Sequence, residues 1–453
     1  MPERPGRQPG SPSWQPDRRP DSPSWHSGGR SGAMPGHSSP NALWRARCFR
    51  VPARAHHAQR PGTAAHSFSA APIGWHIRPL FATLSAMTES IEYITTQLIT
   101  YIGNKRALLP FIQGAVQEVR SRLDGRKIVS FDVFSGSGIV ARLLKQHSTL
   151  VVANDLERYA EIINRCYLTN KSEADTPELR AIHAAITARL ATEPLAEGLI
   201  SHEYAPRDDR NIQPGERVFY TTRNARFLDT ARTRIEEAPE HLRPFLLAPL
   251  LAEASVHANT GGVFKGFYKD RHTGIGSFGG HKGDALGRIT SDIALPYPVF
   301  SNFVSESLVL RGDANSIAPD APKVDLAYID PPYNQHPYGS NYFMLNLLAD
   351  CQKPAALSPV SGIPENWNRS AYNRKAEATQ ALEHLCASIK ASYLLISYNS
   401  EGFIPSDAMR AMLDRIGSVE IRQTRYNTFR ASRNLASRDI HVTEFLFLVK
   451  KRS

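Results

Sequence analysis

The chain has 453 residues, of which 41% are hydrophobic and 21% charged, so it is long enough for one to three domains with a sizeable core. No apolar run approaches the ~18 residues of a transmembrane helix, and the four cysteines fit no zinc, iron–sulfur or disulfide spacing. We therefore expect a protein of a reducing, cytoplasmic compartment, with no membrane partner and no metal site.

Residues 1–86 differ in composition from the rest of the chain. They hold 11 arginines, no lysine and three acidic residues, a net charge of +8 out of +11, and 13 of the 32 prolines. Such a mixture cannot bury enough apolar surface to offset its ordering entropy, so we expect a disordered tail. A basic arm for nucleic acid and an organelle transit peptide remain open. We favour a third interpretation, an over-long reading frame whose folded product begins near Met87.

The next segment predicts the opening of a doubly wound parallel sheet. Apolar residues recur at helical spacing in ALLPFIQGAVQEVRSRL, from Ala107. A β-rich run, KIVSFDVF, then ends in SGSG and is followed by a helical run, IVARLLKQH. TLVVAND predicts a second strand and RYAEIINRCYLTN another helix. This order is typical of an α/β sheet, and we assign residues 87–170 to its first, cofactor-binding half.

The alternation of strands and helices lapses between residues 171 and 308. Helical runs, ARFLDTARTRIEE and FLLAPLLAEASVHA, precede a glycine-rich basic stretch that begins TGGVFKGFYKDRH. The alternation returns with SLVLRGDA, VDLAYIDPPY, QALEHLCASIKA, YLLISYN and DAMRAMLDRIG. VEIRQTRY and HVTEFLFLVKK then predict an antiparallel pair at the sheet edge. We expect a mainly helical insertion at 171–308 and the second, catalytic half of the sheet domain at 309–453.

A glycine motif follows the first predicted strand. Gly136, Gly138 and Ala141 satisfy G-x-G-x-x-A, and Asp155 lies nineteen residues beyond Gly136. Alone, this pattern fits an NAD site as well as other nucleotide-like cofactors. Asp132 and Phe134 add a carboxylate and a ring, which suit a cationic ligand with an amino-acid end better than a pyrophosphate. A plain core role for Phe134 is the alternative.

A rigid turn, Asp330-Pro331-Pro332-Tyr333, ends the apolar run VDLAYI. The prolines cannot donate to a strand ladder, fix their own φ, and push the preceding residue into an extended conformation. The turn therefore presents one carboxylate, free carbonyls and one ring at the lip of a sheet. This arrangement predicts a pre-organised acceptor site with a stacking platform.

Together, these segments resemble a known family. YIGNKRALLPFI, FDVFSGSG, VVAND, LRGDA, YIDPPY, YLLISYN and TEFLFLV are similar, in this order, to the motifs of the Dam-like alpha group of N6-adenine-specific DNA methyltransferases. The resemblance covers essentially all of 95–450 and is weakest at 171–308. It implies a Rossmann-like, S-adenosylmethionine-dependent methyltransferase sheet in which the inserted helical region recognises the target.

The resemblance also implies roles for matching residues. Lys105 would meet the methionyl carboxylate of S-adenosylmethionine, unless it is a solvated surface lysine. Asp313 would accept from the amine of the cofactor's adenine, unless it is an Asx-turn residue. Tyr101 would pack on the ligand, and Asp155 would hold the ribose. The implied cofactor-binding residues are Tyr101, Gly103, Lys105, Asp132, Phe134, Gly136, Gly138, Asp155 and Asp313.

The catalytic set implied by the resemblance is Asp330, Pro331, Pro332 and Tyr333. The exocyclic amine of adenine is a poor nucleophile because its lone pair is delocalised into the ring. The Asp330 carboxylate and the Pro331 carbonyl can accept its two hydrogens and favour a pyramidal nitrogen. Tyr333 can stack on the base, which must first be flipped out of the duplex.

Two clusters of basic and aromatic residues are candidates for DNA contact. One lies in the glycine-rich stretch, where Arg288 is also found, and the other is RQTRYNTFRASRN, which begins with Arg422. Basic groups interleaved with aromatic rings suit phosphate contact and base stacking, although a single arginine more often lies on a solvated face. The predicted contacts are Lys265, Lys269, Arg271, Lys282, Arg425, Arg430 and Arg433.

The predicted activity is methylation of N6 of adenine in a specific double-stranded DNA sequence. Whether a cognate restriction endonuclease exists stays open. RNA adenine methylation is a close alternative, since the flipped base is the same. Cytosine or a glutamine amide as substrate usually goes with Asn or Ser in place of Asp330. A dehydrogenase would leave the proline turn without a role, and an inactive DNA-binding protein on this fold would be expected to have lost Asp330 or the glycine loop.

Overall fold

The computed structural model describes residues 88–280, 283–427 and 441–452. The expectations for the tail at 1–86 and for Lys282, Arg430 and Arg433 lie outside these residues. Within the described ranges, no helix is long and apolar enough to cross a membrane.

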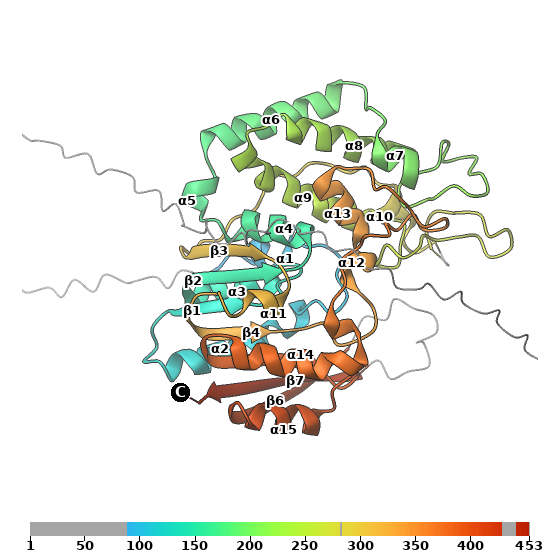
Figure 1. Cartoon of the computed structure of the whole chain (residues 1–453). Coiled ribbons are helices and arrows are strands. Elements are labelled where there is room, and N and C mark those ends of the chain that lie inside the picture. Colours follow the sequence, from blue (N-terminus) through green and yellow to red (C-terminus); the bar gives the residue numbers. More distant parts are fainter. Residues whose placement is uncertain (1–87, 281–282, 428–440, 453) are drawn as a thin grey trace, which may run out of the picture. The chain divides into compact units, whose positions relative to one another are not determined.

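A seven-stranded sheet organises this part of the chain (Figure 1). Its order is β3-β2-β1-β4-β5-β7-β6, with β7 antiparallel to both of its neighbours and the other pairs parallel. The predicted α/β class and the antiparallel pair at one edge are confirmed. The strands are β1 (Ile128–Asp132), β2 (Ser148–Asp155), β3 (Glu306–Arg311), β4 (Val324–Ile329), β5 (Ala391–Asn399), β6 (Gly417–Asn427) and β7 (His441–Lys451).

The central strands are apolar at successive positions because both of their faces are covered. β4 and β5 are buried along nearly their whole length, and they lack the alternation of a half-exposed strand. β3, at one edge, is largely exposed. Its sequence, ESLVLR, contains fewer apolar residues, as an edge strand allows.

Helices pack on both faces of the sheet. On one face, α2 (Leu109–Ser121) and α3 (Ile139–His147) share a core with β1, β2 and β4. On the other, the core includes residues of α11 (Ala314–Ile317), α14 (Lys375–Ser388) and α15 (Ser406–Asp414). The helix expected from Ala107 begins at Leu109, because Arg106–Leu108 form a single 3-10 turn before it.

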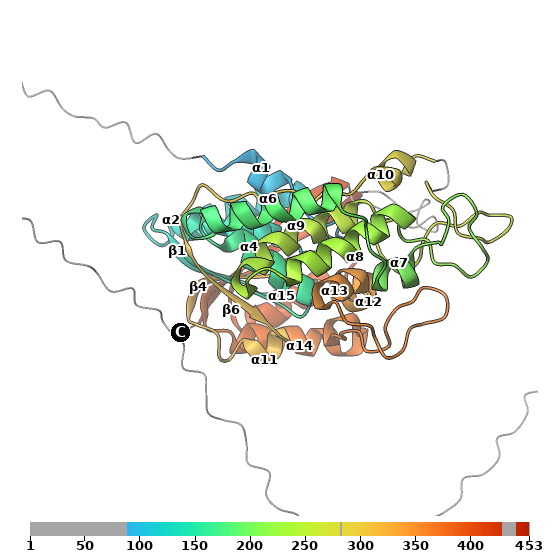
Figure 2. The ribbon, with the colours of Figure 1, turned by 90° about the horizontal axis from the view of Figure 1, so that it is seen from above.

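A mainly helical region separates β2 from β3. Three of its helices, α6, α8 and α9, lie side by side (Figure 2) and share a core with α4 and with α13 (Phe343–Asp350). α4 also contacts β2 and β3 and so joins this region to the sheet. α6 was not predicted, because only Leu179, Ile186 and Leu190 of its sixteen residues are buried. The region contains α4 (Arg158–Leu168), α5 (Lys171–Ala174), α6 (Pro177–Thr192), α7 (Leu199–Tyr204), α8 (Thr222–Glu236), α9 (Arg243–Val256) and α10 (Leu286–Thr290).

Four aspartates gather at the carboxyl edge of the sheet because parallel strands end on the same side. Asp132 ends β1, Asp155 ends β2, Asp313 lies two residues after β3, and Asp330 follows β4 directly. β1 pairs with β2 on one side and with β4 on the other, so the strand order reverses between β1 and β4. Open α/β sheets bind their ligands in the crevice at such a reversal.

Candidate active site

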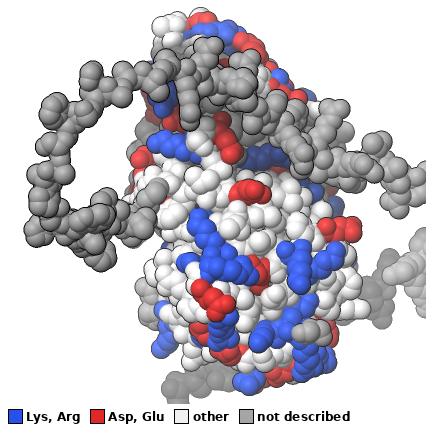
Figure 3. Space-filling model, turned by 90° about the vertical axis from the view of Figure 1, so that its left-hand side faces the viewer, with Lys and Arg blue, Asp and Glu red and all other residues white. Residues whose placement is uncertain are grey.

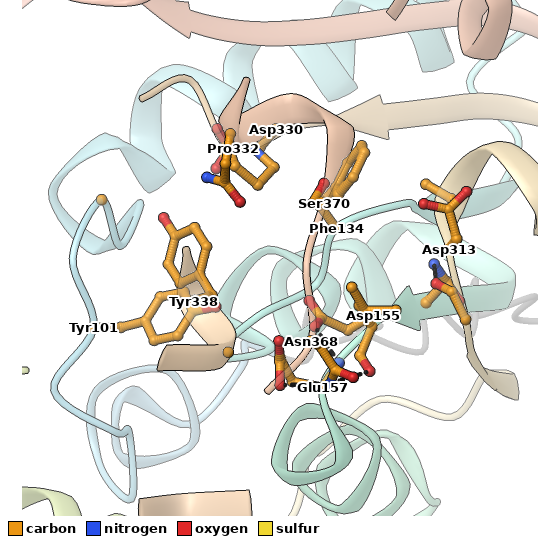
Figure 4. A pocket seen from close by; sticks show the side chains of 17 residues that line it. Tyr101, Phe134, Asp155, Glu157, Asp313, Asp330, Pro332, Tyr338, Asn368 and Ser370 are labelled. Carbon is orange, nitrogen blue, oxygen red and sulfur yellow. Dashed lines mark hydrogen bonds between the residues drawn. The ribbon is translucent and has the colours of Figure 1, made fainter. Parts of the chain in front are cut away.

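A pocket opens at this edge of the sheet (Figure 4). Asp330 and Asp155 lie at opposite ends, with Tyr101 and Tyr338 along one side and Phe134 on the other. Phe134 is therefore a pocket residue and not only a core residue. The lining residues are Tyr101, Gly103, Phe134, Asn154, Asp155, Leu156, Glu157, Gly312, Asp313, Ala314, Asp330, Pro332, Tyr338, Gly339, Asn368, Ser370 and Asn373.

The glycine loop touches the N-terminal segment of the site. Gly136 has a φ of +49°, and a Cβ there would lie 2.8 Å from the ring of Tyr101. A side chain at this position would therefore be strained and would also displace the ring. The Gly136 N–H donates to Asp155 Oδ2 at 2.8 Å. The loop thus fixes the positions of two predicted cofactor residues, Tyr101 and Asp155, while Gly138 is the N-cap residue of α3.

A second carboxylate lies beside Asp155 at this end of the pocket. Glu157 is 3% exposed and accepts hydrogen bonds from Asn346 at 2.6 Å and from Asn368 at 3.0 Å. Burial raises its pKa to about 7. Burial also raises the pKa of Asp155, against the opposing backbone N–H donors of Glu157 and Gly136. Sequence reasoning missed Glu157 because its amide partners follow it by about two hundred residues.

Asp313 forms the Asx turn considered for it and also lies at the pocket. It lines the pocket, and its Oδ1 accepts from the backbone N–H groups of Asn315 and Ser316 at the start of α11. The Asx-turn role and a ligand contact are therefore compatible.

Asp132 is a buried carboxylate without well-formed hydrogen bonds. The residue is only 1% exposed; the Ala141 N–H contacts its carboxyl group weakly, and neither oxygen makes a well-formed hydrogen bond to the described residues. Burial, followed by the nearby Asp330 and Asp155, raises its pKa well above the usual value. Asp132 does not line the pocket itself, so a contact between its carboxyl group and a cofactor stays a prediction.

Lys105 lies between two carboxylates. Its residue is 2% exposed, so the alternative of a solvated surface lysine is wrong. The ammonium lies 2.7 Å from Glu444 Oε1 and 3.2 Å from Asp330 Oδ1. Burial lowers the pKa of Lys105, but Asp330 and Glu444 outweigh it and hold that pKa well above the usual value. Burial raises the pKa of Asp330 to about 7, although Lys105 opposes the shift. Lys105 does not line the pocket itself, and its contact with a cofactor carboxylate stays a prediction.

Two tyrosines of the segment after the proline turn hold the loop that carries Lys105. Tyr342 accepts at its hydroxyl from the Ile102 N–H at 2.7 Å, and the Tyr338 hydroxyl donates to the Ile102 carbonyl at 3.1 Å. The ring of Tyr101 stacks on both rings, at centroid distances of 4.9 Å from Tyr338 and 4.7 Å from Tyr342. Tyr338 belongs to the short helix α12 (Tyr338–Asn341). This segment therefore couples the turn to the N-terminal motif.

Tyr333 is partly buried beside Lys105 and its carboxylate partners Asp330 and Glu444. Its ring packs edge-on against Tyr398 at 5.8 Å, and its carbonyl accepts from the Phe403 N–H at 3.1 Å. The Lys105 ammonium lies 5.8 Å from the centre of the ring. These contacts fix the orientation of the ring that the sequence assigns to base stacking.

The basic candidates for DNA contact fall into two groups. Lys265, Lys269 and Arg425 are exposed. Arg288, in contrast, donates to the carbonyls of Val256, Ala258 and Thr260, and Arg422 pairs with Glu118 and Glu420. These two arginines therefore brace the fold, and the role of the exposed group stays a prediction. Charge alone does not mark a DNA-binding face in Figure 3, where basic side chains are interspersed with acidic ones.

The chain matches a known family over most of its length. The model of the D12 class N6 adenine-specific DNA methyltransferases matches residues 101–275 and 301–412. The chain belongs to this family. It is similar to the type II methyltransferase M.NlaIII of Neisseria lactamica, with 30% identity over 363 residues, covering 78% of this chain and 99% of that protein.

Two further relatives agree with this assignment. The type II methyltransferase M.CviAII of Paramecium bursaria Chlorella virus 1 is 28% identical over 78% of this chain and 98% of its own length. The type II methyltransferase M.FokI of Planomicrobium okeanokoites is 27% identical over 78% of this chain but only 52% of its own length. The predicted family and the predicted class of enzyme, an adenine-specific DNA methyltransferase, are confirmed. The seven-stranded sheet agrees with a methyltransferase fold.

Proposed function

We propose that this D12 enzyme transfers a methyl group from S-adenosylmethionine to N6 of an adenine flipped out of a specific double-stranded DNA sequence. One observation carries the proposal. The carboxylate of Asp330, on its rigid proline turn, lines the same pocket as Asp155 and Asp313. A pocket that holds a donor at one end and an acceptor for the target amine at the other would bring the two reactants together.

The residues of the pocket fit S-adenosylmethionine. Asp155 lines the pocket and can accept from ribose hydroxyls, and the carboxyl group of Asp132, which does not itself line the pocket, suits an ammonium. Asp313 keeps its Oδ2 for an exocyclic amine, since its Oδ1 caps α11. When bound, this cofactor supplies an electrophilic methyl group on a sulfonium.

Asp330 and Pro331 act on the target amine. Asp330 Oδ1 faces the Lys105 ammonium at 3.2 Å, which leaves Oδ2 of this partly exposed side chain to accept from an N–H of the base. The Pro331 carbonyl supplies the second acceptor, and no backbone N–H at either proline competes with the base. Acceptors fixed before the base arrives stabilise the pyramidal nitrogen without reorganisation. The ionised form of Asp330 is the stronger acceptor.

DNA would be held by the exposed basic residues and read by the inserted region 171–308. Lys265 lies close enough to His336, in the loop after the turn, to lower the pKa of that imidazole, together with the larger effect of burial. Lys265, Lys269, Arg271 and Arg425 would contact phosphates, and Tyr333 would stack on the flipped base. Because its relatives are named type II methyltransferases, we also propose a cognate restriction endonuclease as a partner of the system.

The test is single-turnover transfer of a tritiated methyl group onto duplex DNA, with DNA affinity measured separately. Asp330→Ala is expected to reduce the rate roughly 100- to 1,000-fold, as is typical for one pre-organised group, and to affect affinity less. Tyr333→Phe keeps the ring and should be mild, whereas Tyr333→Ala should also weaken base capture. Near wild-type transfer to adenine by Asp330→Ala would contradict the assignment.

A further inference from the structure

Glu444 is a fully buried carboxylate that the mechanism above does not use. It is 0% exposed and lies on β7, where it pairs in register with Asn399 of β5. Its Oε1 accepts from the Ser397 hydroxyl and from the Lys105 ammonium. Burying a carboxylate is costly unless it is paired, so its position beside Lys105 requires an explanation.

One ammonium is shared between two carboxylates at this point. Lys105 Nζ is closer to Glu444, with a hydrogen bond of 2.7 Å, than to Asp330, at 3.2 Å. With both carboxylates ionised, the three groups carry a net charge of −1. If Glu444 were absent, the ammonium would have Asp330 as its remaining carboxylate partner. It would then be held by Asp330 alone, through the Oδ1 contact that is 3.2 Å long while Glu444 is present.

We propose that Glu444 is a positioning residue that acts through Lys105. It draws the ammonium away from full contact with Asp330, so that Asp330 keeps an oxygen free and strongly accepting for the target amine. This inference rests on the proposed role of Asp330. Glu444, on β7, thus controls how strongly the Lys105 ammonium pairs with the Asp330 carboxylate, which follows β4 on the other side of β5.

The surroundings of Asp330 leave Lys105 and Glu444 as its main charged neighbours. Burial raises the pKa of Asp132, on β1, well above the usual value and so disfavours its ionised form. Four tyrosines also face the group, and burial raises the pKa of each, so they are neutral near pH 7. They are Tyr328 on β4, Tyr333 in the turn, Tyr338 on α12 and Tyr426 on β6.

The two charged neighbours act on Asp330 in opposite directions. After the larger effect of burial, Lys105 lowers the pKa of Asp330 and Glu444 raises it. Glu444→Gln removes the charge with little change in shape and leaves Lys105 to Asp330. The acidic limb of the pH–rate profile should then move to lower pH by about one unit, and the plateau rate should fall roughly tenfold. Lys105→Met should move the limb the opposite way, to higher pH.

The experiment measures single-turnover methyl transfer to duplex DNA from pH 5.5 to pH 9 at saturating S-adenosylmethionine. It compares the full chain with Glu444→Gln, Lys105→Met and the matched control Glu420→Gln. Glu420 lies on the adjacent strand β6 and pairs with Arg122, so its variant should leave the profile unchanged. A merely structural role of Glu444 would lower thermal stability and rate together and would not move the limb.

A double variant keeps the test decisive if Glu444→Gln does not fold. In Lys105→Met/Glu444→Gln both charges are gone, and the plateau rate should match that of Lys105→Met within about twofold, because Glu444 acts through the lysine. An acidic limb that stays in place or moves upward in Glu444→Gln would overturn the inference, as would a further large loss in the double variant. If Asp330→Ala remains active, the proposed role of Asp330 has failed instead.

Discussion

Replacing Asp330 by asparagine is expected to stabilise the fold while it removes the activity. The pKa of Asp330 is raised from 3.8 to about 7, chiefly by burial. At pH 8 the folded protein therefore holds a carboxylate whose ionisation is unfavourable by about 3 pKa units, or roughly 4 kcal/mol. A neutral amide of the same shape avoids this cost. Lys105 keeps its 2.7 Å hydrogen bond to Glu444, so the substitution leaves no isolated ammonium.

The sign of this effect depends on pH. Because the folded-state pKa is raised, the stability that protonated Asp330 contributes is present below about pH 4 and is lost as pH rises through about 7. Asp330→Asn should therefore unfold at a higher denaturant concentration than wild type at pH 8, with a Tm roughly 5 °C higher. The difference in stability between Asp330→Asn and wild type should narrow as pH falls, and it should nearly disappear by pH 4.5.

Asp325→Asn is a matched control on the same stretch of chain. Both aspartate side chains are 17% exposed, but the Arg126 hydrogen bond is the main reason that the pKa of Asp325 is lowered. Its replacement should not stabilise the fold at pH 8. If Asp330→Asn is no more stable than wild type at that pH, the attraction of Lys105 outweighs desolvation, and the reasoning about this carboxylate is wrong.

Three further predictions concern the ligands. Gly136→Ala should weaken S-adenosylmethionine binding at least tenfold by calorimetry, because the new methyl group would meet Tyr101; unchanged affinity would show that the loop adapts. Asp155→Ala should weaken the same binding by ~1.5–3 kcal/mol, and NAD should not bind; preferred binding of NAD would contradict the cofactor assignment. DNA affinity should fall steeply with salt, and Lys265→Ala should lower the slope of log affinity against log salt by about one; an unaltered slope would remove Lys265 from the phosphate contacts.

Local patterns in the sequence predicted the sheet and singled out several of the residues that line the pocket. The strand–glycine loop–helix order and the proline turn depend on residues close together in the chain, so their conformations follow from local sterics and hydrophobic periodicity. The roles of Asp155, Asp313 and Asp330 were implied by the family resemblance, and they line one pocket because acids that follow parallel strands meet at one edge of a sheet. α6 escaped prediction because it buries only three of its sixteen residues, so its apolar stripe is narrow.

Only the tertiary structure decided the partners of these residues. Lys105 and Glu444 are 339 positions apart, and they meet because β7 runs antiparallel between β5 and β6, which brings its beginning to the carboxyl edge. Glu157 likewise acquires its amide partners from α13 and from the segment after it. A sequence specifies which side chains can carry charge, but burial and long-range neighbours decide whether that charge is paired. For that reason the proline turn that carries Asp330 could be recognised in the sequence. The raised pKa of Asp330, and the contributions of Lys105 and Glu444 to it, could not.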